Sequence, residues 1–480
     1  MLFNSFQFLI FFIVVTTAYF TLPHKYRWML LLAASCYFYM VFVPVYILIL
    51  GFTIVVDYFA GIYIEKSQGK KRKWFLVASL IANIGVLAVF KYYNFLNENL
   101  TILLHGAGYE NPIPYLSILL PIGLSFHTFQ AMSYTIEVYR GNQKSERNFG
   151  IYALYVMFYP QLVAGPIERP QNLIHQFYEK HKFDYDRVTS GLKLMAWGLF
   201  KKMVIADRLA YVTDTIYNNP QAHDSIPLII GTVFFAFQIY CDFSGYSDIA
   251  IGSAQVMGFK LMRNFNRPYL SKSISEFWSR WHISLSTWFK DYLYIPLGGN
   301  RVSVPRWYLN LFLVFLISGL WHGANWTFII WGGLHGFYLV FALVTEKLRR
   351  RINEKVGLTK HPKLLSVLQV ITTFILADFA WIFFRANNVS DAFHIVKKIT
   401  VDFSWKTTNW NLGLAPIDIA LVVATIIFME WIHLLQNKIS IRQTISKKPF
   451  VWRWAIYCAW VAAIILFGVF EDRNFIYFQF

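Results

Sequence analysis

The sequence predicts an all-α, polytopic membrane protein with about a dozen transmembrane helices. Hydrophobic residues make up 56% of the 480 residues and charged residues only 15%, which is too apolar for a soluble domain of this size. Apolar runs recur along the whole chain, and Trp and Tyr stand repeatedly at their ends, where rings with a polar edge prefer the headgroup boundary. These observations place the chain inside a bilayer.

The apolar runs define the expected elements in chain order, since one crossing needs about 20 mostly apolar residues. The candidate runs lie near residues 5–22, 28–43, 45–64, 74–96, 114–136, 149–164, 190–212, 226–248, 308–323, 326–344, 364–384, 414–436 and 451–470. The first run has no basic leader and no small-residue cleavage site, so we expect a retained span rather than a signal peptide. We also expect interfacial or re-entrant helices beside the full spans.

Loop charge sets the expected orientation, because short basic loops stay on the cytoplasmic side. Residues 65–73 hold five basic residues and define that side, whereas residues 97–113 and 214–225 contain no Lys or Arg and suit the opposite face. Successive loops alternate between the two sides of the membrane if just one of the runs 149–164 and 190–212 crosses fully. The other run would be re-entrant or lie in the interface, and both termini would be extracytoplasmic.

The expected organisation is one membrane domain over residues 1–480. It comprises N-terminal spans over 1–113, a motif-rich core over about 114–345, C-terminal spans over 364–470 and a tail over 471–480. No fixed-period repeat is evident, and no soluble segment longer than about 50 residues interrupts the spans.

The net charge of +18 raises the question of nucleic-acid binding. The basic residues fall in short loops between apolar runs, which favours retention of those loops in the cytoplasm and argues against a nucleic-acid partner. The cysteines, Cys36, Cys241 and Cys458, show neither paired nor metal-ligand spacing. We therefore expect no disulfide framework and no metal site.

A titratable imidazole, His322, lies in the apolar segment SGLWHGANW of residues 318–326. A polar side chain at membrane depth costs free energy unless it is paired or lines a wet cavity, so His322 is a candidate functional residue. The alternative is a packing histidine that hydrogen-bonds a neighbouring helix.

Several motifs together resemble the membrane-bound O-acyltransferase superfamily, and within it the bacterial branch that O-acetylates alginate. The resemblance covers most of the chain and is densest over residues 159–336. The residues that carry it are YPQLVAGPIER at 159–169, CDFSGYSD at 241–248, SEFWSRWHISLS at 275–286, DYLYIPLGGNR at 291–301, LWHGANW at 320–326 and FIYFQF at 475–480.

The resemblance implies a catalytic role for His322 and a second functional position at His282. It also implies a central tunnel through which an acyl group, acetyl above all, moves from a thioester onto hydroxyls of an exported polysaccharide. Such systems need an extracytoplasmic acetyltransferase partner, and we expect the chain to reside among the lipids of a bacterial cytoplasmic (inner) membrane. The alternatives are D-alanyl transfer to teichoic acid and a non-enzymatic transporter or flippase.

The residue chemistry agrees with acyl transfer, which needs a base that titrates near neutrality and donors for an oxyanion. His322 is the candidate base. If the segment is helical, Asn325 shares the face of His322, where it could donate to the oxyanion or orient the ring. Asn325 could equally tie helices together.

The donor is expected to be a cytosolic thioester such as acetyl-CoA, used as a substrate, with no bound cofactor. The segment 260–306 carries eight basic residues against Glu276 and Asp291, a surface that would attract phosphates. The candidate donor-binding residues are Arg280, Lys290 and Arg301. The alternative is ordinary retention of a basic cytoplasmic loop.

Two further groups are candidate site residues. Asp242 and Asp248 are candidates for supporting the site or its oxyanion, because they bracket the Gly-containing segment 244–247, which suggests irregular backbone that faces a cavity. Structural partnering is the alternative role of each carboxylate. The tail FIYFQF resembles the terminal motif of a small partner in the teichoic acid D-alanylation system. By that likeness Tyr477 would carry the acyl group, and the alternative is a hydrophobic anchor.

Overall fold

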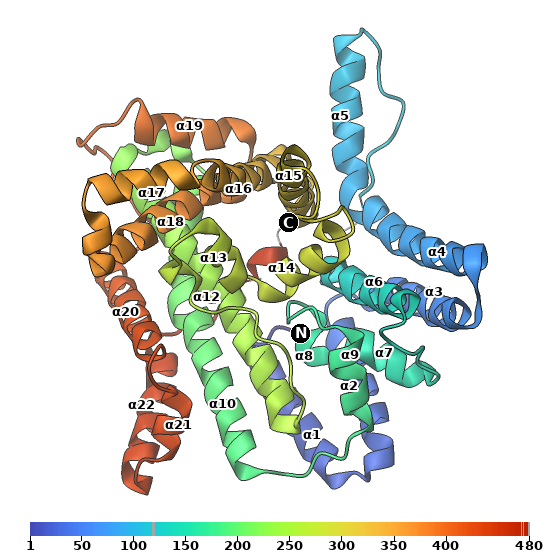
Figure 1. The fold of residues 1–480 in the computed structure, drawn as a ribbon. Helices are drawn as coiled ribbons and strands as arrows, with labels where there is room; N and C mark the ends of the chain where they lie inside the picture. Colours follow the sequence, from blue (N-terminus) through green and yellow to red (C-terminus); the bar gives the residue numbers. More distant parts are fainter. Residues whose placement is uncertain (118–120, 472, 474, 479–480) are drawn as a thin grey trace. The chain divides into compact units, whose positions relative to one another are not determined.

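The computed structural model describes residues 1–117, 121–471, 473 and 475–478, and all regular secondary structure in that part of the chain is helical (Figure 1). Within it, eight helices are long and apolar enough to cross a membrane by length and composition, and the shorter helix α1 is also apolar. The all-α membrane fold predicted from the sequence is thereby confirmed. Residues 118–120 of the predicted run 114–136, and residues 472, 474, 479 and 480 of the predicted tail, lie outside the described residues.

The described chain divides into two compact units, and helix α12 (Ser225–Met257) contributes to both. Of the described residues, the first unit contains those of 1–198 and 246–262 together with 477 and 478. Its elements are α1 (Phe6–Thr21), α2 (His24–Met40), η1 (Pro44–Tyr46), α3 (Ile47–Lys66), α4 (Gly69–Leu87), η2 (Ala88–Tyr92), α5 (Tyr93–Gly106), α6 (Leu124–Arg140), α7 (Phe149–Met157), α8 (Tyr159–Leu162), α9 (Pro170–Leu173), η3 (Ile174–Tyr178) and α10 (Tyr185–Leu199).

The second unit contains residues 199–245 and 263–476 and holds both candidate histidines. Its elements are η4 (Phe200–Ala206), α11 (Asp207–Tyr217), η5 (Pro220–Ala222), η6 (Pro268–Leu270), α13 (Ile274–Arg280), α14 (Ile283–Phe289), η7 (Lys290–Tyr294), α15 (Val304–His322), α16 (Trp326–Val344), α17 (Glu346–Lys355), η8 (Leu358–Lys360), α18 (Pro362–Arg385), α19 (Val389–Thr400), α20 (Pro416–Leu435), α21 (Ile441–Ser446) and α22 (Phe450–Phe467), and η9 (Ile476–Phe478) begins at its end.

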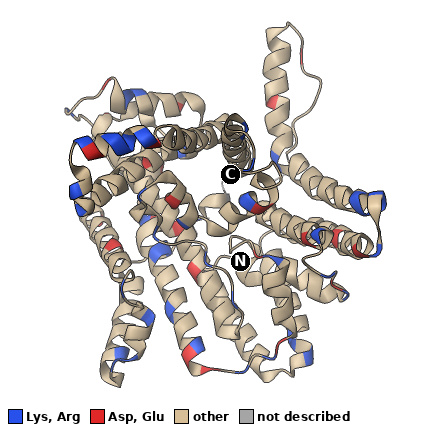
Figure 2. Cartoon of the chain, in the orientation of Figure 1, with Lys and Arg blue, Asp and Glu red and all other residues tan. Residues whose placement is uncertain are grey.

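Charge is distributed as a bilayer requires. Figure 2 shows Lys and Arg mainly at helix ends, in connecting segments and on α17, while most of the long helices carry few charges. Helix α17 is amphipathic, with exposed apolar Leu348 and Ile352 among basic residues, a pattern typical of a helix at the membrane surface.

Two of the predicted runs are interrupted. The run 149–164 breaks at Phe158 into α7 and the short α8, each too short to cross alone. The run 190–212 becomes α10, the π-helical segment η4 and α11. Lys201 and Lys202 of this run are buried, because Ser244 and two aspartates supply polar partners inside the unit.

Another run is longer than predicted. The run 74–96 extends over residues Gly69–Gly106 as two α-helical stretches joined by the π-helical η2, so about half of the expected extracytoplasmic loop 97–113 is helical.

The irregular backbone predicted at residues 244–247 is wrong, because α12 is continuous from Ser225 to Met257. Most of its apolar window is buried, where each backbone N–H and C=O needs a partner and the helix supplies one internally. Ser244 accepts a hydrogen bond from the Lys201 amine (2.8 Å) rather than breaking the helix.

Helices α15 and α16 form a tightly packed hairpin that carries His322 at its turn. A Cβ on Gly332 would stand 2.3 Å from the Phe315 carbonyl oxygen, and a Cβ on Gly319 would stand 2.3 Å from that of Phe328. Small residues at such positions let two membrane helices approach closely. The hairpin therefore places the end of α15 against the buried face of α16.

Candidate functional site

His322 is the last residue of α15 and is buried among aromatic rings. Its ring centroid lies 5.0 Å from that of Trp331 and 5.4 Å from that of Phe384, both in edge-on geometry. Helix α15 ends here because Gly323 adopts an extended conformation (φ −157°, ψ 145°). The imidazole therefore stands at a helix end and not within a continuous span.

Trp331 stands between two histidines. The His335 ring centroid also lies 5.0 Å from that of Trp331, and His335 Nδ1 accepts a hydrogen bond from the Trp278 indole N–H (3.2 Å). An indole N–H can only donate, so the proton of neutral His335 resides on Nε2. Trp278 therefore occupies the Nδ1 side of His335 and fixes its tautomer.

The Trp331 indole N–H is a buried donor next to His322. Among the residues that the structure describes, nothing accepts a hydrogen bond from it. A buried donor without an acceptor is costly, so this group is suited to a ligand oxygen that arrives during function.

His282 lies between α13 and α14 in the left-handed conformation (φ 42°, ψ 55°), which is strained for a residue with a side chain. Two backbone hydrogen bonds hold the segment 264–266 against the residues that flank His282. The Asn266 N–H donates to the Arg280 carbonyl (2.8 Å), and the Ile283 N–H donates to the Asn264 carbonyl (2.9 Å).

Asn264 fixes the tautomer of His282. The Asn264 Oδ1 atom accepts from the Ser284 backbone N–H (3.2 Å), which identifies that atom as the amide oxygen. His282 Nδ1 lies 3.1 Å from the same oxygen and must therefore carry the proton. In the neutral ring the lone pair then resides on Nε2. Burial lowers the pKa of His282 to about 3, so the ring is neutral at physiological pH.

The two predicted histidines flank one indole. The Trp321 ring centroid lies 4.8 Å from that of His322 and 6.4 Å from that of His282. The structure therefore brings His282 and His322 into one buried cluster, although they are 40 residues apart in the sequence.

A cavity of about 640 Å³ lies between α13, α14, α15, α16 and α17. Its walls are mostly apolar and include Trp307, Val314 and Ser318 of α15. Its exposed charged residues are Lys290, Arg349 and the acidic Glu346. Ser318 is one turn before His322, about 6 Å along the helix axis and on the same face. The cavity thus ends within one helical turn of His322, which is not itself among the lining residues.

The structure separates the three predicted donor-binding residues. Lys290 is exposed and lines the cavity. Arg280 pairs with Glu276 (2.5 Å), so its charge is already balanced, and Arg301 is exposed on the turn before α15.

The predicted common helix face of His322 and Asn325 is wrong, because α15 ends at His322. Asn325 is the N-cap of α16, and its side chain accepts from the Thr327 backbone N–H (2.9 Å). Asn favours this position because its oxygen satisfies an amide that has no partner within the helix. That oxygen is therefore committed to helix capping.

Asp242 is a structural partner in a buried ion cluster. The Lys202 amine lies 2.7 Å from Asp242 and 2.8 Å from Asp207, and all three side chains are buried. Asp242 also accepts from the Ile476 backbone N–H (2.8 Å). A carboxylate engaged in this way cannot donate to an oxyanion. Asp248 is half-buried, two turns further along α12.

The tail is docked, as its apolar composition requires. Phe475 and Ile476 are buried, and the Phe475 ring lies 5.6 Å from that of Phe243, which in turn lies 4.6 Å from His282. Tyr477 is half-buried with its hydroxyl oxygen buried, and its ring contacts Phe126 at 6.4 Å.

Sequence reasoning missed Asn264, Trp331 and Lys202. Asn264 had no signal of its own, since its role depends on a loop that returns 18 residues later. Lys202 had a signal, because a lysine in an apolar run is costly unless it pairs with an acidic residue, and Asp242 lies in another apolar run.

Comparisons with known proteins agree on one family. The model described as MBOAT, membrane-bound O-acyltransferase family, matches residues 142–384. The probable alginate O-acetylase AlgI of Pseudomonas aeruginosa is 38% identical over 443 residues, covering 91% of this chain and 82% of that protein. The peptidoglycan O-acetyltransferase of Helicobacter pylori is 39% identical over 395 residues, covering 76% of this chain and 72% of that protein. The teichoic acid D-alanyltransferase of Bacillus subtilis is 27% identical over 342 residues, covering 68% of this chain and 81% of that protein.

The tautomer of His282 is directly measurable. In protein labelled with ¹⁵N-histidine, we expect the His282 signal, assigned by its loss in His282→Gln, to show a neutral Nδ1–H ring from pH 8 down to about pH 4. In Asn264→Asp the new carboxylate should raise the pKa by about a unit or more. Titration of wild-type His282 near pH 6.5 would contradict the assignment.

The same lowered pKa fixes a stability trend. Between pH 6.5 and about pH 3 the unfolded chain binds a proton at His282 that the folded chain does not bind. The contribution of this group to stability therefore falls as the pH falls through that window.

Proposed function

This chain belongs to the membrane-bound O-acyltransferase family and is an acyltransferase, and we propose that it moves an acetyl group from a cytosolic thioester across the membrane toward hydroxyls of an exported polysaccharide. The more similar relatives named above are O-acetylating enzymes of alginate and peptidoglycan, while the teichoic acid D-alanyltransferase is more distant. The proposed location is the bacterial cytoplasmic membrane, with both termini extracytoplasmic.

One observation carries the proposal: a cavity with cations at its rim runs along α15 to within one turn of a buried imidazole. Lys290 would meet the phosphates of acetyl-CoA, and the apolar walls would enclose its arm. A route for a phosphate-bearing thioester fits an acyl donor. A transporter or flippase would not require the thioester carbonyl to end beside a base.

In the proposed reaction, His322 removes the proton of the acceptor hydroxyl while that oxygen attacks the thioester carbonyl. A tetrahedral oxyanion forms, and we assign the Trp331 indole N–H as its donor, in place of Asn325. The C–S bond then breaks, and the thiolate takes the proton from His322. The oxygen–acyl bond replaces the sulfur–acyl bond, and the base is restored.

Tyr477 is the proposed first acceptor. Its phenol would receive the acyl group and pass it to an extracytoplasmic acetyltransferase partner, which would complete transfer to the polysaccharide. The buried position of the Tyr477 hydroxyl supports a role inside the protein for the tail segment.

The role of His322 has a matched control in His335, since both buried rings lie 5.0 Å from Trp331. We expect His322→Gln to lower acetyl transfer from labelled acetyl-CoA by about a hundred- to ten-thousand-fold, the usual worth of a general base. His335→Gln keeps an acceptor for the Trp278 N–H and should retain most activity. Equal losses in both variants, or full turnover in His322→Gln, would show that another group is the base.

Lys290 should govern donor binding. We expect Lys290→Gln to raise the KM for acetyl-CoA several-fold at unchanged kcat, because it removes one phosphate contact that is made equally in the ground and transition states. Lys272→Gln removes an equally exposed lysine that does not line the cavity, and its KM should stay at the wild-type value. The same KM for all three proteins would exclude Lys290 from the donor site.

The carrier role of Tyr477 predicts a covalent adduct. After incubation with labelled acetyl-CoA, mass spectrometry of wild-type protein should find the label as an ester on Tyr477. Tyr477→Phe should abolish both the label and transfer, whereas Tyr185→Phe, which alters an exposed tyrosine, should abolish neither. Full transfer by Tyr477→Phe would leave the tail with an anchoring role alone.

A further inference from the structure

The chain that leaves α22 is fastened to η4 and α11 at residues 467, 469, 471 and 473, and to α12 at residue 476. Every contact in this series lies within the second unit. Arg208 donates to the Phe467 carbonyl (2.9 Å), the Val469 N–H donates to the Met203 carbonyl (3.0 Å), Tyr211 donates to Glu471 (2.7 Å), Arg473 pairs with Asp214 (3.4 Å), and the Ile476 N–H donates to Asp242 (2.8 Å).

The π-helical form of η4 supplies one of these contacts. The Asp207 N–H donates to the Lys202 carbonyl, five residues back rather than four. When α-helical spacing resumes, the next carbonyl, that of Met203, is left without a donor in its own helix. The Val469 N–H fills that place.

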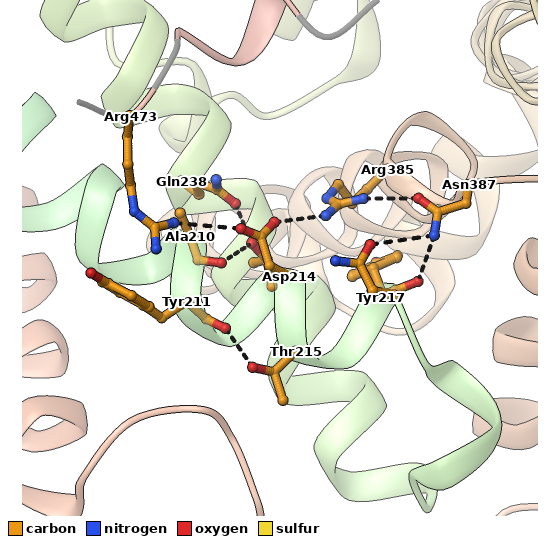
Figure 3. Close-up of polar contacts among 11 residues, drawn as sticks. Ala210, Tyr211, Asp214, Thr215, Tyr217, Gln238, Arg385, Asn387 and Arg473 are labelled. Atoms are coloured by element: carbon orange, nitrogen blue, oxygen red, sulfur yellow. Dashed lines mark hydrogen bonds and ion pairs between the residues drawn. The ribbon is translucent and has the colours of Figure 1, made fainter. Parts of the chain in front are cut away.

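The outer contacts lie at the surface and contribute little. The Asp214 side chain is 44% exposed and shared between Arg473 and Arg385, as Figure 3 shows, and the Glu471 side chain is 67% exposed. Arg473 also lies over the Tyr211 ring at 3.7 Å. Ion pairs this exposed are screened by water and add little stability.

The inner contact is of another kind, because Asp242, Phe475 and Ile476 are all buried. A carboxylate that accepts from a backbone N–H in such a place forms a strong, charge-assisted hydrogen bond. The next residue of α12, Phe243, contacts both Phe475 and His282. Residues Phe475 and Ile476 are thus held by one hydrogen bond, and the Phe243 ring alone connects Phe475 to His282 in this series of contacts.

We propose that Asp242 is a positioning residue that seats the tail beside His282, and that Lys202 and Asp207 hold its carboxylate in place. This assignment replaces the oxyanion role that the sequence suggested for Asp242. It deepens the proposed function, since Tyr477 directly follows the seated Ile476. The seat itself is a structural claim and can be tested without measuring activity.

The first test compares Asp242→Leu with Asp242→Asn in the full-length protein in detergent. Both variants remove the same charge, but the amide oxygen of Asn still accepts from the Ile476 N–H, whereas Leu does not. Hydrogen exchange of the peptide covering residues 468–478 should be at least tenfold faster than wild type in Asp242→Leu. In Asp242→Asn it should stay within about threefold.

The second test removes the donor and leaves the buried charges intact. Ile476→Pro lacks the N–H at the first residue of η9, a position where proline is tolerated in a helix, and Ile476→Val keeps it. The remaining amides of the same peptide should exchange at least tenfold faster in Ile476→Pro than in Ile476→Val. This pair decides the matter if Asp242→Leu does not fold.

Wild-type protection in both Asp242→Leu and Ile476→Pro overturns the seat, whatever happens to acetyl transfer. Equal exchange in Asp242→Leu and Asp242→Asn overturns it as well. Lost protection together with lost transfer supports the seat and the carrier role of Tyr477. Lost protection with full transfer supports the seat and removes that carrier role.

Discussion

The buried amine of Lys202, held between Asp207 and Asp242, is the interaction on which much of the second unit depends. It lets charged residues occupy an otherwise apolar run, because each charge meets an opposite one at hydrogen-bond distance. Removing one partner of such a group typically costs about 3 to 5 kcal/mol, since the others are left buried and uncompensated. The cluster joins η4 and α11 to the part of α12 that contacts His282 and the tail.

Sequence reasoning found what depends on composition and on single residues in unusual places. The all-helical membrane fold followed from long apolar runs, and His322 stood out as a polar residue within one of them. His282 was identified by the family resemblance. Sequence reasoning failed where a contact depends on how distant segments of the chain fold together. Helix α12 stays regular through Gly245. Leaving buried backbone N–H and C=O groups without partners costs more free energy than placing one glycine inside a helix. Asn325 was misplaced because Gly323 ends α15 one residue after His322.

The site shows the same division. Lys290, Arg280 and Arg301 look alike as basic residues in one segment, and only folding distinguishes them, by placing Glu276 against Arg280 and a cavity beside Lys290. Asn264 and Trp331 carry no motif that single-sequence reasoning could read. Asn264 matters because its amide oxygen meets the ring of a residue 18 positions away, and Trp331 because its indole N–H is buried without an acceptor among the residues described.

The environment of His282 suits a role other than that of a base. A general base is most effective when its pKa lies near the operating pH, because it must hold the proton that it removes. His282 has a pKa of about 3 and a tautomer fixed by Asn264, so its Nε2 can accept a hydrogen bond but holds a proton poorly. That suits a residue that orients a hydroxyl. Proton removal is the role proposed for His322, which stands at the end of the helix that the cavity follows.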